Sequence, residues 1–398
     1  MKRFLPFILS VAAIVCCVTT GDTQNAGTDT RLGVWVTIFS PQKVHYSREG
    51  ADRLIDDCVK CGINDIYLQV YRADKAYYDS SLTDRSEYEK MLSSSGTDMI
   101  RYIIEKASEK RISVHAWINL LSLAQNQNAN IIRKFGEDVL TRDQHGRLSM
   151  PLGKKDDLDK YYTREDQLFL EPGDYRVRQY LSDIACEIVD KYPGLSGLHL
   201  DYIRYPFTVP FIPGSRFSSH GISYGYARMD LESFTKSTGL DAMKMERSRD
   251  NFTLWDDWRR ERVTTLVKYI SGAARKISPS LIISCTIVPS LERTYYATFQ
   301  DWTEWLDKGY VDRVVTMNYT DDAKLARLRS RSIAGSYDRK KLMIGLGAYM
   351  LREKPGILER EILDSKDLAT GGIVFFSYDE IAQDSSLRDF IAATFGQK

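Results

Sequence analysis

The chain has 398 residues, 43% of them hydrophobic, which is enough apolar material for a large buried core. Its 55 basic and 54 acidic side chains almost cancel, so the chain offers no basic field to a nucleic acid backbone. A content of 25 glycines and 11 prolines is ordinary for a globular protein. These numbers exclude a disordered or fibrous chain, argue against nucleic acid as a partner and favour one large enzyme domain.

The amino terminus has the pattern of an export signal. Two basic residues precede an apolar run over residues 4–15 that is too short to span a bilayer. The run ends at Cys16 and Cys17, and residues 18–30 are mostly small and polar, as in a flexible tether. We therefore expect a signal peptide over residues 1–17, followed by this tether.

The end of the signal is similar to a bacterial lipoprotein signal, with Cys17 as the residue that receives the lipid. A plain signal peptide that is cleaved nearby is the alternative. The expected location is the cell envelope, on its periplasmic or surface face. Contact with the membrane is expected only through the lipid anchor.

From residue 31 onward, short runs rich in β-branched residues alternate with longer segments that have a period of 3.6 residues. This alternation is typical of βα units around a parallel sheet. The expected strands are Gly33–Phe39, Asp65–Tyr71, Ser113–Leu120, Ser196–Ile203, Leu281–Val288, Arg313–Tyr319, Lys341–Tyr349 and Gly372–Tyr378. Eight such units close a barrel, so residues 31–398 are predicted to form a single (β/α)8 TIM barrel of the α/β class.

Such a barrel usually needs about 250 residues, so the excess is expected in insertions on the catalytic face. Two long segments fit this expectation, Leu121–Glu171 after the third strand and Phe207–Thr253 after the fourth. Both are rich in Gly, Ser, Asn, Asp and aromatic residues. Two long helices are clearly marked by their apolar stripes, over residues 175–192 and 254–277.

Asp201 ends the fourth expected strand and is the leading catalytic candidate. Because side chains alternate along a strand, His199 and Asp201 face one way and the adjacent leucines face the helices. Asp is depleted in strands and rarely buried without a partner, and barrel enzymes do their chemistry at the carboxyl ends of the strands. A structural ion pair with Arg204 is the alternative for Asp201.

A metal site could be drawn from His115, His199 and Asp201. Strand positions two apart lie in different layers of the barrel, however, and no further ligand cluster is evident in the sequence. We therefore expect neither a metal nor another cofactor.

Polar and aromatic side chains at the other strand ends are expected to bind substrate. The alternation places Tyr67, Gln69 and Tyr71 inside on the second strand, and Trp117 and Asn119 inside on the third. Flat aromatic faces suit the C–H surfaces of sugars, although many such rings simply pack the rim of a barrel. The further substrate-binding candidates are Trp35, Arg72, His199, Tyr202, Arg204, Asn318, Tyr319, Ser377, Tyr378 and Asp379.

Several of these motifs resemble the glycosyl hydrolase-like family 10, whose members are secreted (β/α)8 barrels related to the α-amylase group. The specific match is the segment GLHLDYIRYP at residues 197–206. Supporting matches are Gly33-Val34-Trp35, Trp258-Arg259-Arg260, Met317-Asn318-Tyr319, Gly345-Leu346-Gly347-Ala348-Tyr349 and Phe376-Ser377-Tyr378-Asp379. The resemblance covers nearly the whole mature chain. It implies hydrolysis of glycosidic bonds in a carbohydrate polymer, with peptidoglycan strands stripped of peptides as the favoured substrate.

Glycoside hydrolysis usually needs two carboxyl groups, about 5 Å apart for retention and roughly 6.5 to 9.5 Å apart for inversion. The resemblance implies that Asp201 is the nucleophile or base. It also implies a proton donor after the fifth strand, where Glu292 is the nearest acid, with Asp321 and Asp379 as rivals. Many family members carry a second Asp directly after Asp201, whereas this chain has Tyr202 there.

Two other classes of function remain open. A barrel without a working pair of acids would be a non-catalytic, glycan-binding surface lipoprotein. An esterase or deacetylase is less favoured, because the chain has no G-x-S-x-G motif and few candidate metal ligands.

Overall fold

The computed structural model describes residues 30–150, 165–207 and 222–396. The expected signal peptide, the lipidation site Cys17 and residues 18–29 of the tether lie outside the described residues. Among the described residues, none of the helices combines the length and the apolar character needed to cross a membrane.

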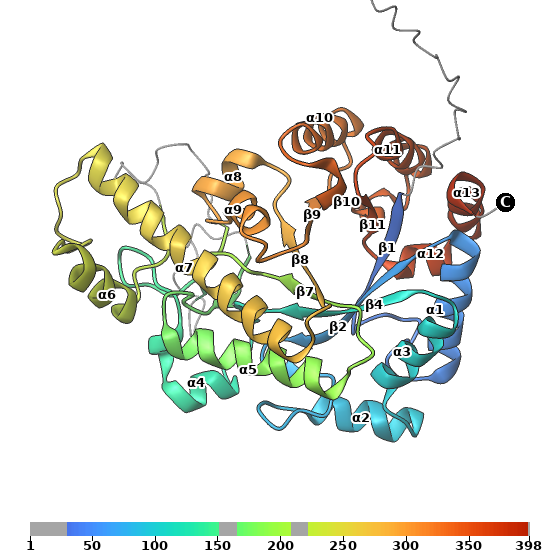
Figure 1. The fold of residues 1–398 in the computed structure, drawn as a ribbon, viewed down its shortest axis with the longest axis horizontal. Helices are drawn as coiled ribbons and strands as arrows, with labels where there is room; N and C mark the ends of the chain where they lie inside the picture. Colours follow the sequence, from blue (N-terminus) through green and yellow to red (C-terminus); the bar gives the residue numbers. More distant parts are fainter. Residues whose placement is uncertain (1–29, 151–164, 208–221, 397–398) are drawn as a thin grey trace, which may run out of the picture.

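A closed barrel of eight parallel strands forms the centre of the molecule (Figure 1), as the sequence predicts. Its strands are β1 (Arg31–Val36), β2 (Asp65–Arg72), β4 (Ser113–Asn119), β7 (Gly197–Asp201), β8 (Ile282–Ile287), β9 (Arg313–Asn318), β10 (Leu342–Leu346) and β11 (Gly372–Phe375). They pair in this order, and β1 closes the barrel because it pairs with both β2 and β11.

Helices surround the barrel (Figure 1). They are α1 (Arg48–Cys61), α2 (Ser86–Ser95), α3 (Met99–Glu109), α5 (Tyr175–Lys191), α7 (Arg249–Ile277), α8 (Leu291–Tyr296), α9 (Trp302–Asp307), α10 (Ala323–Ala334), α11 (Pro355–Asp367), α12 (Tyr378–Gln383) and α13 (Ser385–Phe395). Short 3-10 turns lie at Glu137–Val139, Arg339–Lys341 and Ala348–Leu351.

The two expected insertions carry the remaining elements. The segment after β4 contains β5 (Ser122–Ala124), α4 (Asn130–Phe135) and β6 (Leu168–Phe169), and the segment after β7 contains α6 (Arg228–Thr238). A short strand β3 (Lys75–Ala76) folds back antiparallel on the end of β2. The helix α6 and the first half of α7 lie to one side of the barrel (left in Figure 1).

Local signals in the sequence explain where the helices begin and end. The side chain of Ser47 caps α1 by accepting from the amide of Gly50, and Gly62 ends the helix with a left-handed φ of 69°. The helix α7 begins at Arg249, earlier than the expected residue 254, because Ser248 caps it by accepting from the amide of Asn251.

Large side chains fill the barrel interior. The buried inner cluster consists of Trp35, Tyr67, Trp117, Val315, Met343 and Val374. At the amino-terminal end of the strands, Asp65 is fully buried and accepts hydrogen bonds from Arg31 and His115. This closed floor leaves the carboxyl end of the barrel as the face where a substrate can approach the interior.

Candidate active site

Asp201 lies at the carboxyl end of β7, and only 5% of its surface is exposed. Four groups donate hydrogen bonds to its carboxylate. Oδ1 accepts from Thr286 Oγ1 at 2.6 Å and from the Tyr202 amide at 2.8 Å. Oδ2 accepts from Trp117 Nε1 at 3.0 Å and from Asn119 Nδ2 at 3.3 Å. All four partners donate, which is the environment of an ionised carboxylate that can act only as an acceptor.

A chain of amide hydrogen bonds orients the Asn119 donor. Gln69 Nε2 donates to Asn119 Oδ1 at 2.7 Å, and Gln69 Oε1 accepts from the backbone amide of Ile38 at 3.2 Å. Because its oxygen is engaged in this way, Asn119 must turn its NH2 group toward Asp201. The loop after β1 is thereby connected to the Asp201 carboxylate through two buried side chains.

Two opposing effects act on the pKa of Asp201. Burial raises it, and the hydrogen bonds from Thr286, the Tyr202 amide and Trp117 lower it, with the balance above the ordinary value for Asp. The Asp201 carboxylate is therefore poorly solvated and more basic than a surface carboxylate. Such a group is suited to accept a proton or to attack an electrophilic carbon.

The backbone after Asp201 has an unusual conformation. Tyr202 has a φ of 50°, in the left-handed region that non-glycine residues seldom adopt, and this turn aims its amide at Asp201 Oδ1. Its ring lies 6.0 Å from the ring of Phe169 and 4.9 Å from the Arg204 guanidinium. Asp tolerates this conformation better than Tyr does. An Asp at the position of Tyr202, as many members of the family have, would therefore adopt this left-handed backbone conformation more easily.

Aromatic rings form one wall of the barrel mouth. Phe376 lies centrally, with ring centroids 5.5 Å from Tyr319, 5.7 Å from Tyr349 and 6.3 Å from Trp117. Burial, and next the charge of Asp201, raise the pKa of Tyr319 well above its ordinary value. The mouth therefore combines a basic carboxylate with flat apolar faces.

Trp35 and His199 lie deeper than the sequence analysis expects of substrate-binding residues. Trp35 Nε1 donates to His199 Nε2 at 3.0 Å, so His199 carries its proton on Nδ1 and shares it with Ser284 Oγ at 2.8 Å. Burial lowers the pKa of His199 well below its ordinary value, so the ring is neutral. Both side chains are 1% exposed or less and fill the barrel below Asp201.

The expectation that Tyr71 faces inward is wrong. A β-bulge between Gln69 and Tyr71 shifts the register, so that Tyr71 pairs with Ile118 and turns to the outer face of the barrel. Its hydroxyl donates to Asp74 at 3.0 Å, beneath Tyr180 of α5. Tyr71 belongs to the packing between barrel and helices.

Asn318 and Tyr378 also face away from the mouth, which corrects their expected role at the substrate. Asn318 Nδ2 donates to the carbonyl of Ala326 and to Ser330 Oγ on α10, at 2.9 and 2.8 Å. The hydroxyl of Tyr378 donates to Asp57 of α1 at 3.0 Å. Alternation from the inward-facing Val315 places Asn318 on the outer side of β9. Tyr378 lies beyond the end of β11, in the first turn of α12, where alternation along a strand no longer applies.

The three candidate proton donors lie in different surroundings. Glu292 is exposed in the first turn of α8, and among the residues that the structure describes it has no hydrogen-bond or ion-pair partner. Asp321 is exposed and accepts from Lys354 Nζ at 2.7 Å, which lowers its pKa and holds it ionised. Asp379 is partly buried, and burial raises its pKa against the hydrogen bonds from Ser40 and Ser377.

Asp379 and Asp201 belong to opposite sides of the barrel. Asp379 follows β11, Asp201 ends β7, and these two strands are separated by three others in either direction around the barrel. Ser377, 6% exposed, connects the carboxyl group of Asp379 to the end of β11. Among the three acids, Asp379 has the environment that best maintains a protonated carboxyl group.

Arg204 is buried, but its partner is not Asp201. Its guanidinium binds both oxygens of Glu165, at 3.0 and 2.6 Å, in the insertion after β4. The ion pair expected between Arg204 and Asp201 is therefore not formed. Instead, the ion pair between Arg204 and Glu165 connects the segments that follow β7 and β4. Asp201 keeps its four neutral donors.

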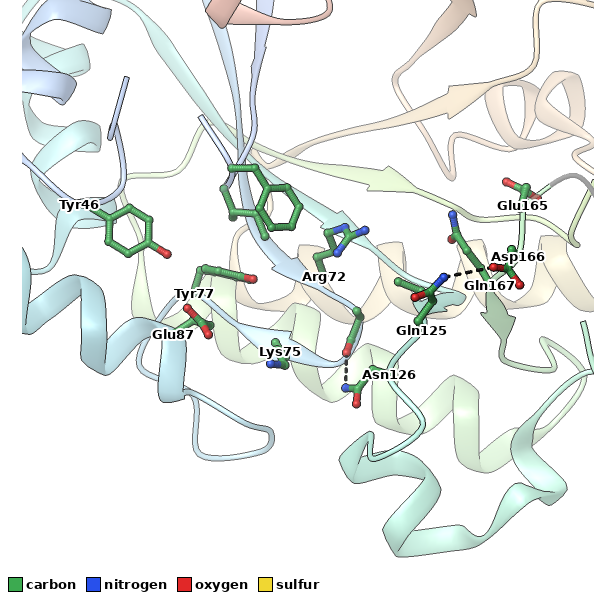
Figure 2. Close-up of a pocket in the computed structure, with 14 residues that line it drawn as sticks. Tyr46, Arg72, Lys75, Tyr77, Glu87, Gln125, Asn126, Glu165, Asp166 and Gln167 are labelled. Carbon is green, nitrogen blue, oxygen red and sulfur yellow. Dashed lines mark hydrogen bonds between the residues drawn. The ribbon is translucent and has the colours of Figure 1, made fainter. Parts of the chain in front are cut away.

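A cleft of about 640 Å³ opens beside the mouth (Figure 2). Its lining residues come from the loop after β1, from the end of β2 and from the insertion after β4, and they include Phe39, Arg72, Tyr77, Gln125 and Gln167. In Figure 2, Arg72 lies between the side of the cleft formed by Tyr46 and Tyr77 and the side formed by Gln125 and Glu165. Arg72 thus lies among polar and aromatic groups of the cleft.

Three residues that shape this region were not predicted from the sequence: Thr286, Phe376 and Phe39. Alternation along β8 would have placed Thr286 inside, beside Asp201, and alternation along β11 would have done the same for Phe376. Phe39 carries no such signal, because it lies in a loop whose course depends on its neighbours.

Comparison with known proteins gives the family context. Residues 31–349 match the family model described as glycosyl hydrolase-like 10. The glycosyl hydrolase YngK of Bacillus subtilis (strain 168) is 23% identical over 346 residues, which cover 80% of this chain and 60% of YngK. The glycosyl hydrolase DigH of Escherichia coli (strain K12) is 22% identical over 281 residues, which cover 67% of this chain and 56% of DigH. The chain thus spans somewhat more than half the length of these relatives.

Solved structures share the fold. The catalytic domain of a β-amylase from Paenibacillus polymyxa superimposes with a TM-score of 0.58 at 12% identity, covering 92% of this chain and 99% of that domain. A β-galactosidase from the psychrophilic Marinomonas ef1 superimposes with a TM-score of 0.59 at 10% identity, covering 92% of this chain and 59% of that protein. At such identities the likeness concerns the barrel alone.

Proposed function

Because the chain belongs to the glycosyl hydrolase-like 10 family, we propose that it hydrolyses glycosidic bonds in a polysaccharide of the cell envelope. Peptidoglycan glycan strands stripped of peptides are the favoured substrate. The observation that carries the proposal is the Asp201 carboxylate, which is held by four donors at the barrel mouth. The aromatic wall around Phe376 supports it, because rings of this kind stack on sugar faces.

Asp201 serves as the nucleophile or base in this proposal. Its four donors occupy the lone-pair directions of the two oxygens in the free enzyme, so a substrate must displace one of them. The bond from Asn119 is the longest, at 3.3 Å, which makes Oδ2 the oxygen that engages the substrate at the lowest cost. The remaining donors keep the carboxylate oriented while it reacts.

Asp379 serves as the proton donor in this proposal. Its partial burial and raised pKa support that role, because a general acid must carry its proton at the working pH. Asp321 is less suited, because Lys354 stabilises its charge. Glu292, the acid favoured by the family resemblance, is the remaining rival.

The decisive experiment measures the release of reducing ends from purified glycan strands by the wild type and by Asp201→Asn. We expect wild-type release and a loss of at least about 10³-fold in the variant, with an unchanged melting temperature. Unchanged turnover by Asp201→Asn would refute the catalytic assignment. If neither protein releases reducing ends but both bind the strands, the protein is the non-catalytic glycan-binding lipoprotein.

We also propose that the protein is exported and anchored through a lipid on Cys17. Metabolic labelling with an alkyne fatty acid should mark the wild type and fail to mark Cys17→Ser. Cys186→Ser is the matched control, because Cys186 lies on α5, far along the chain from the signal. A wild type that takes up no label would leave the plain signal peptide as the explanation of the leader, and label retained by Cys17→Ser would place the lipid on another residue.

A further inference from the structure

The cleft beside the mouth contains a cation that has no counterion within the described part of the chain. Arg72 ends β2, and its guanidinium carbon stands 5.1 Å from the centre of the Phe39 ring, in the loop after β1. Throughout residues 30–150, 165–207 and 222–396, no side chain or carbonyl forms a hydrogen bond or ion pair with the Arg72 guanidinium. Phe39 itself is 67% exposed, although it is a large apolar residue.

The acids that line the same cleft do not neutralise Arg72. Glu87 binds Lys90 Nζ at 2.8 Å, and Glu165 binds Arg204 at 2.6 Å. Each of these carboxylates is therefore already paired with another cation. An unpaired guanidinium has all its N–H donors available to a ligand. A ligand that binds it does not have to break an ion pair within the protein.

Two other charged groups line the cleft. The charge of Lys75 acts on Asp84, whose pKa is lowered first by the hydrogen bond from the Ser86 amide and further by Lys75. Asp166 is exposed and accepts from Gln125 Nε2 at 3.3 Å. Lys75 and Arg72 are thus both without an ion pair among the described residues, and Arg72 is the one of the two that is placed by a ring contact, with Phe39.

Hydrogen bonds connect residues that line the cleft with the residues around Asp201. Ile38 lines the cleft, and its amide donates to Gln69 Oε1, the first member of the amide chain that reaches Asp201 through Asn119. Glu165 lines the cleft as well and holds Arg204, three residues beyond Asp201. The cleft therefore shares the loop after β1 and the insertion after β4 with the hydrogen-bond network around Asp201.

We propose that the cleft is a subsite for an acidic sugar of the glycan, whose carboxylate Arg72 binds with its two parallel N–H groups. A guanidinium matches a carboxylate in this bidentate geometry better than any other side chain does. Phe39 holds the guanidinium plane in the cleft and leaves an exposed ring for the apolar face of the sugar. The inference rests on the proposed function for the glycan, and it adds that the chain selects glycans bearing carboxylates.

The test compares one glycan with and without its charge. Peptide-free peptidoglycan strands carry free carboxylates, and these groups can be reduced to alcohols by carbodiimide activation and borohydride. Binding of both forms to the full-length Asp201→Asn protein is measured by calorimetry, so that cleavage does not interfere. We expect the reduced strands to bind about 10-fold more weakly, as for the loss of a charged hydrogen-bonded pair.

Variants of Arg72 assign the effect. Adding Arg72→Gln to the Asp201→Asn protein should bring the ratio of the affinities for native and reduced strands close to one. Adding Arg72→Lys instead should keep part of the preference for native strands. Arg360→Gln is the matched control, because Arg360 is 63% exposed on α11 and should leave the ratio as it is. Melting temperatures verify folding, and the charge-retaining Arg72→Lys variant decides the question if Arg72→Gln unfolds.

The inference is overturned if native and reduced strands bind equally well to the parent protein, or if the ratio survives Arg72→Gln. Failure of the proposed function has a different signature. In that case either Asp201→Asn and wild type release reducing ends equally, or neither protein releases them. The ratio of the affinities for native and reduced strands still tests the role of Arg72.

Discussion

The Thr286 hydroxyl donates a hydrogen bond of 2.6 Å to Oδ1 of Asp201 from the neighbouring strand β8. It is the shortest of the four bonds to this carboxylate, and both residues are at most 5% exposed. A short bond from a buried hydroxyl stabilises the ionised form, so Thr286 opposes the effect of burial on the pKa of Asp201.

Replacing Thr286 by Val should therefore raise the pKa of Asp201 further. If Asp201 acts ionised, the acidic limb of the profile of kcat/KM against pH moves to higher pH, by about one unit for one charged hydrogen bond. Thr316→Val is a matched control, because Thr316 is buried on β9 and its hydroxyl has no partner among the described residues. A profile that does not move in Thr286→Val would contradict the role of Asp201 as an ionised base or nucleophile.

The proton donor can be identified from the dependence on the leaving group. Asp379→Asn should lower kcat on glycan strands by about 10²-fold or more, and it should affect an aryl glycoside with an acidic phenol much less, because that leaving group needs no proton. Glu292→Gln and Asp321→Asn, measured side by side, should keep kcat within a few-fold of wild type. A selective loss in Glu292→Gln, with Asp379→Asn active, would transfer the role to Glu292.

Tyr71→Phe distinguishes the outward orientation of this side chain from the inward one that alternation predicts. The variant deletes a buried donor to Asp74, so the free energy of unfolding should fall by about 1 kcal/mol. Because Tyr71 lies on the outer face of the barrel, KM for glycan strands should stay as in wild type. Chemical denaturation and steady-state kinetics on the same preparation provide both values, and a raised KM without loss of stability would contradict this placement.

A buried pair of acids makes the insertions sensitive to pH. Glu171 accepts from Tyr205 and Thr141, and Asp230 of α6 accepts from Trp258 of α7. Burial raises the pKa of both, and the charge of Glu171 raises that of Asp230 further, although Trp258 and the nearby arginines of α7 oppose this.

The sign of the pH dependence follows from these raised values. An acid whose pKa is higher in the folded state contributes stability below its unfolded pKa of about 4, and this stability is lost as the pH rises toward the folded value. Asp230→Asn removes the titrating group and keeps an oxygen for Trp258. The difference between the melting temperature of the variant and that of wild type should therefore increase, in favour of the variant, as the pH is raised from 4 to 8. A constant difference between the two proteins across this range would show that Asp230 does not titrate there.

Much of the site follows from the alternation of side chains along the strands. Trp117 and Asn119 on β4 and Asp201 on β7 were predictable as inward neighbours, and the structure connects them by hydrogen bonds. The same rule fails at Tyr71, where the bulge in β2 adds one residue and inverts the facing of those that follow. A bulge depends on how two strands pair, and a single strand sequence does not show it.

The roles of the acids depend on burial and on partners from distant parts of the chain. Glu292, Asp321 and Asp379 look alike in the sequence, since each follows a strand of the barrel. Their surroundings differ because Lys354 reaches Asp321, whereas Ser40 and Ser377 enclose Asp379. Likewise, Arg204 and Glu165 are 39 residues apart and form their ion pair only when the two insertions meet.

Periodic patterns in the sequence by themselves determined the barrel, its eight strands and the position of Asp201 at a strand end, because hydrophobic periodicity is a local property. The family resemblance is local as well, since it rests on short motifs, of which the segment at residues 197–206 is the most specific. Only the tertiary structure decided which side chains surround the Asp201 carboxylate and which acid is buried enough to hold a proton. It also left Arg72 without a counterion among the residues that the structure describes. These properties arise from contacts between segments far apart in the chain, and such contacts set desolvation and charge pairing.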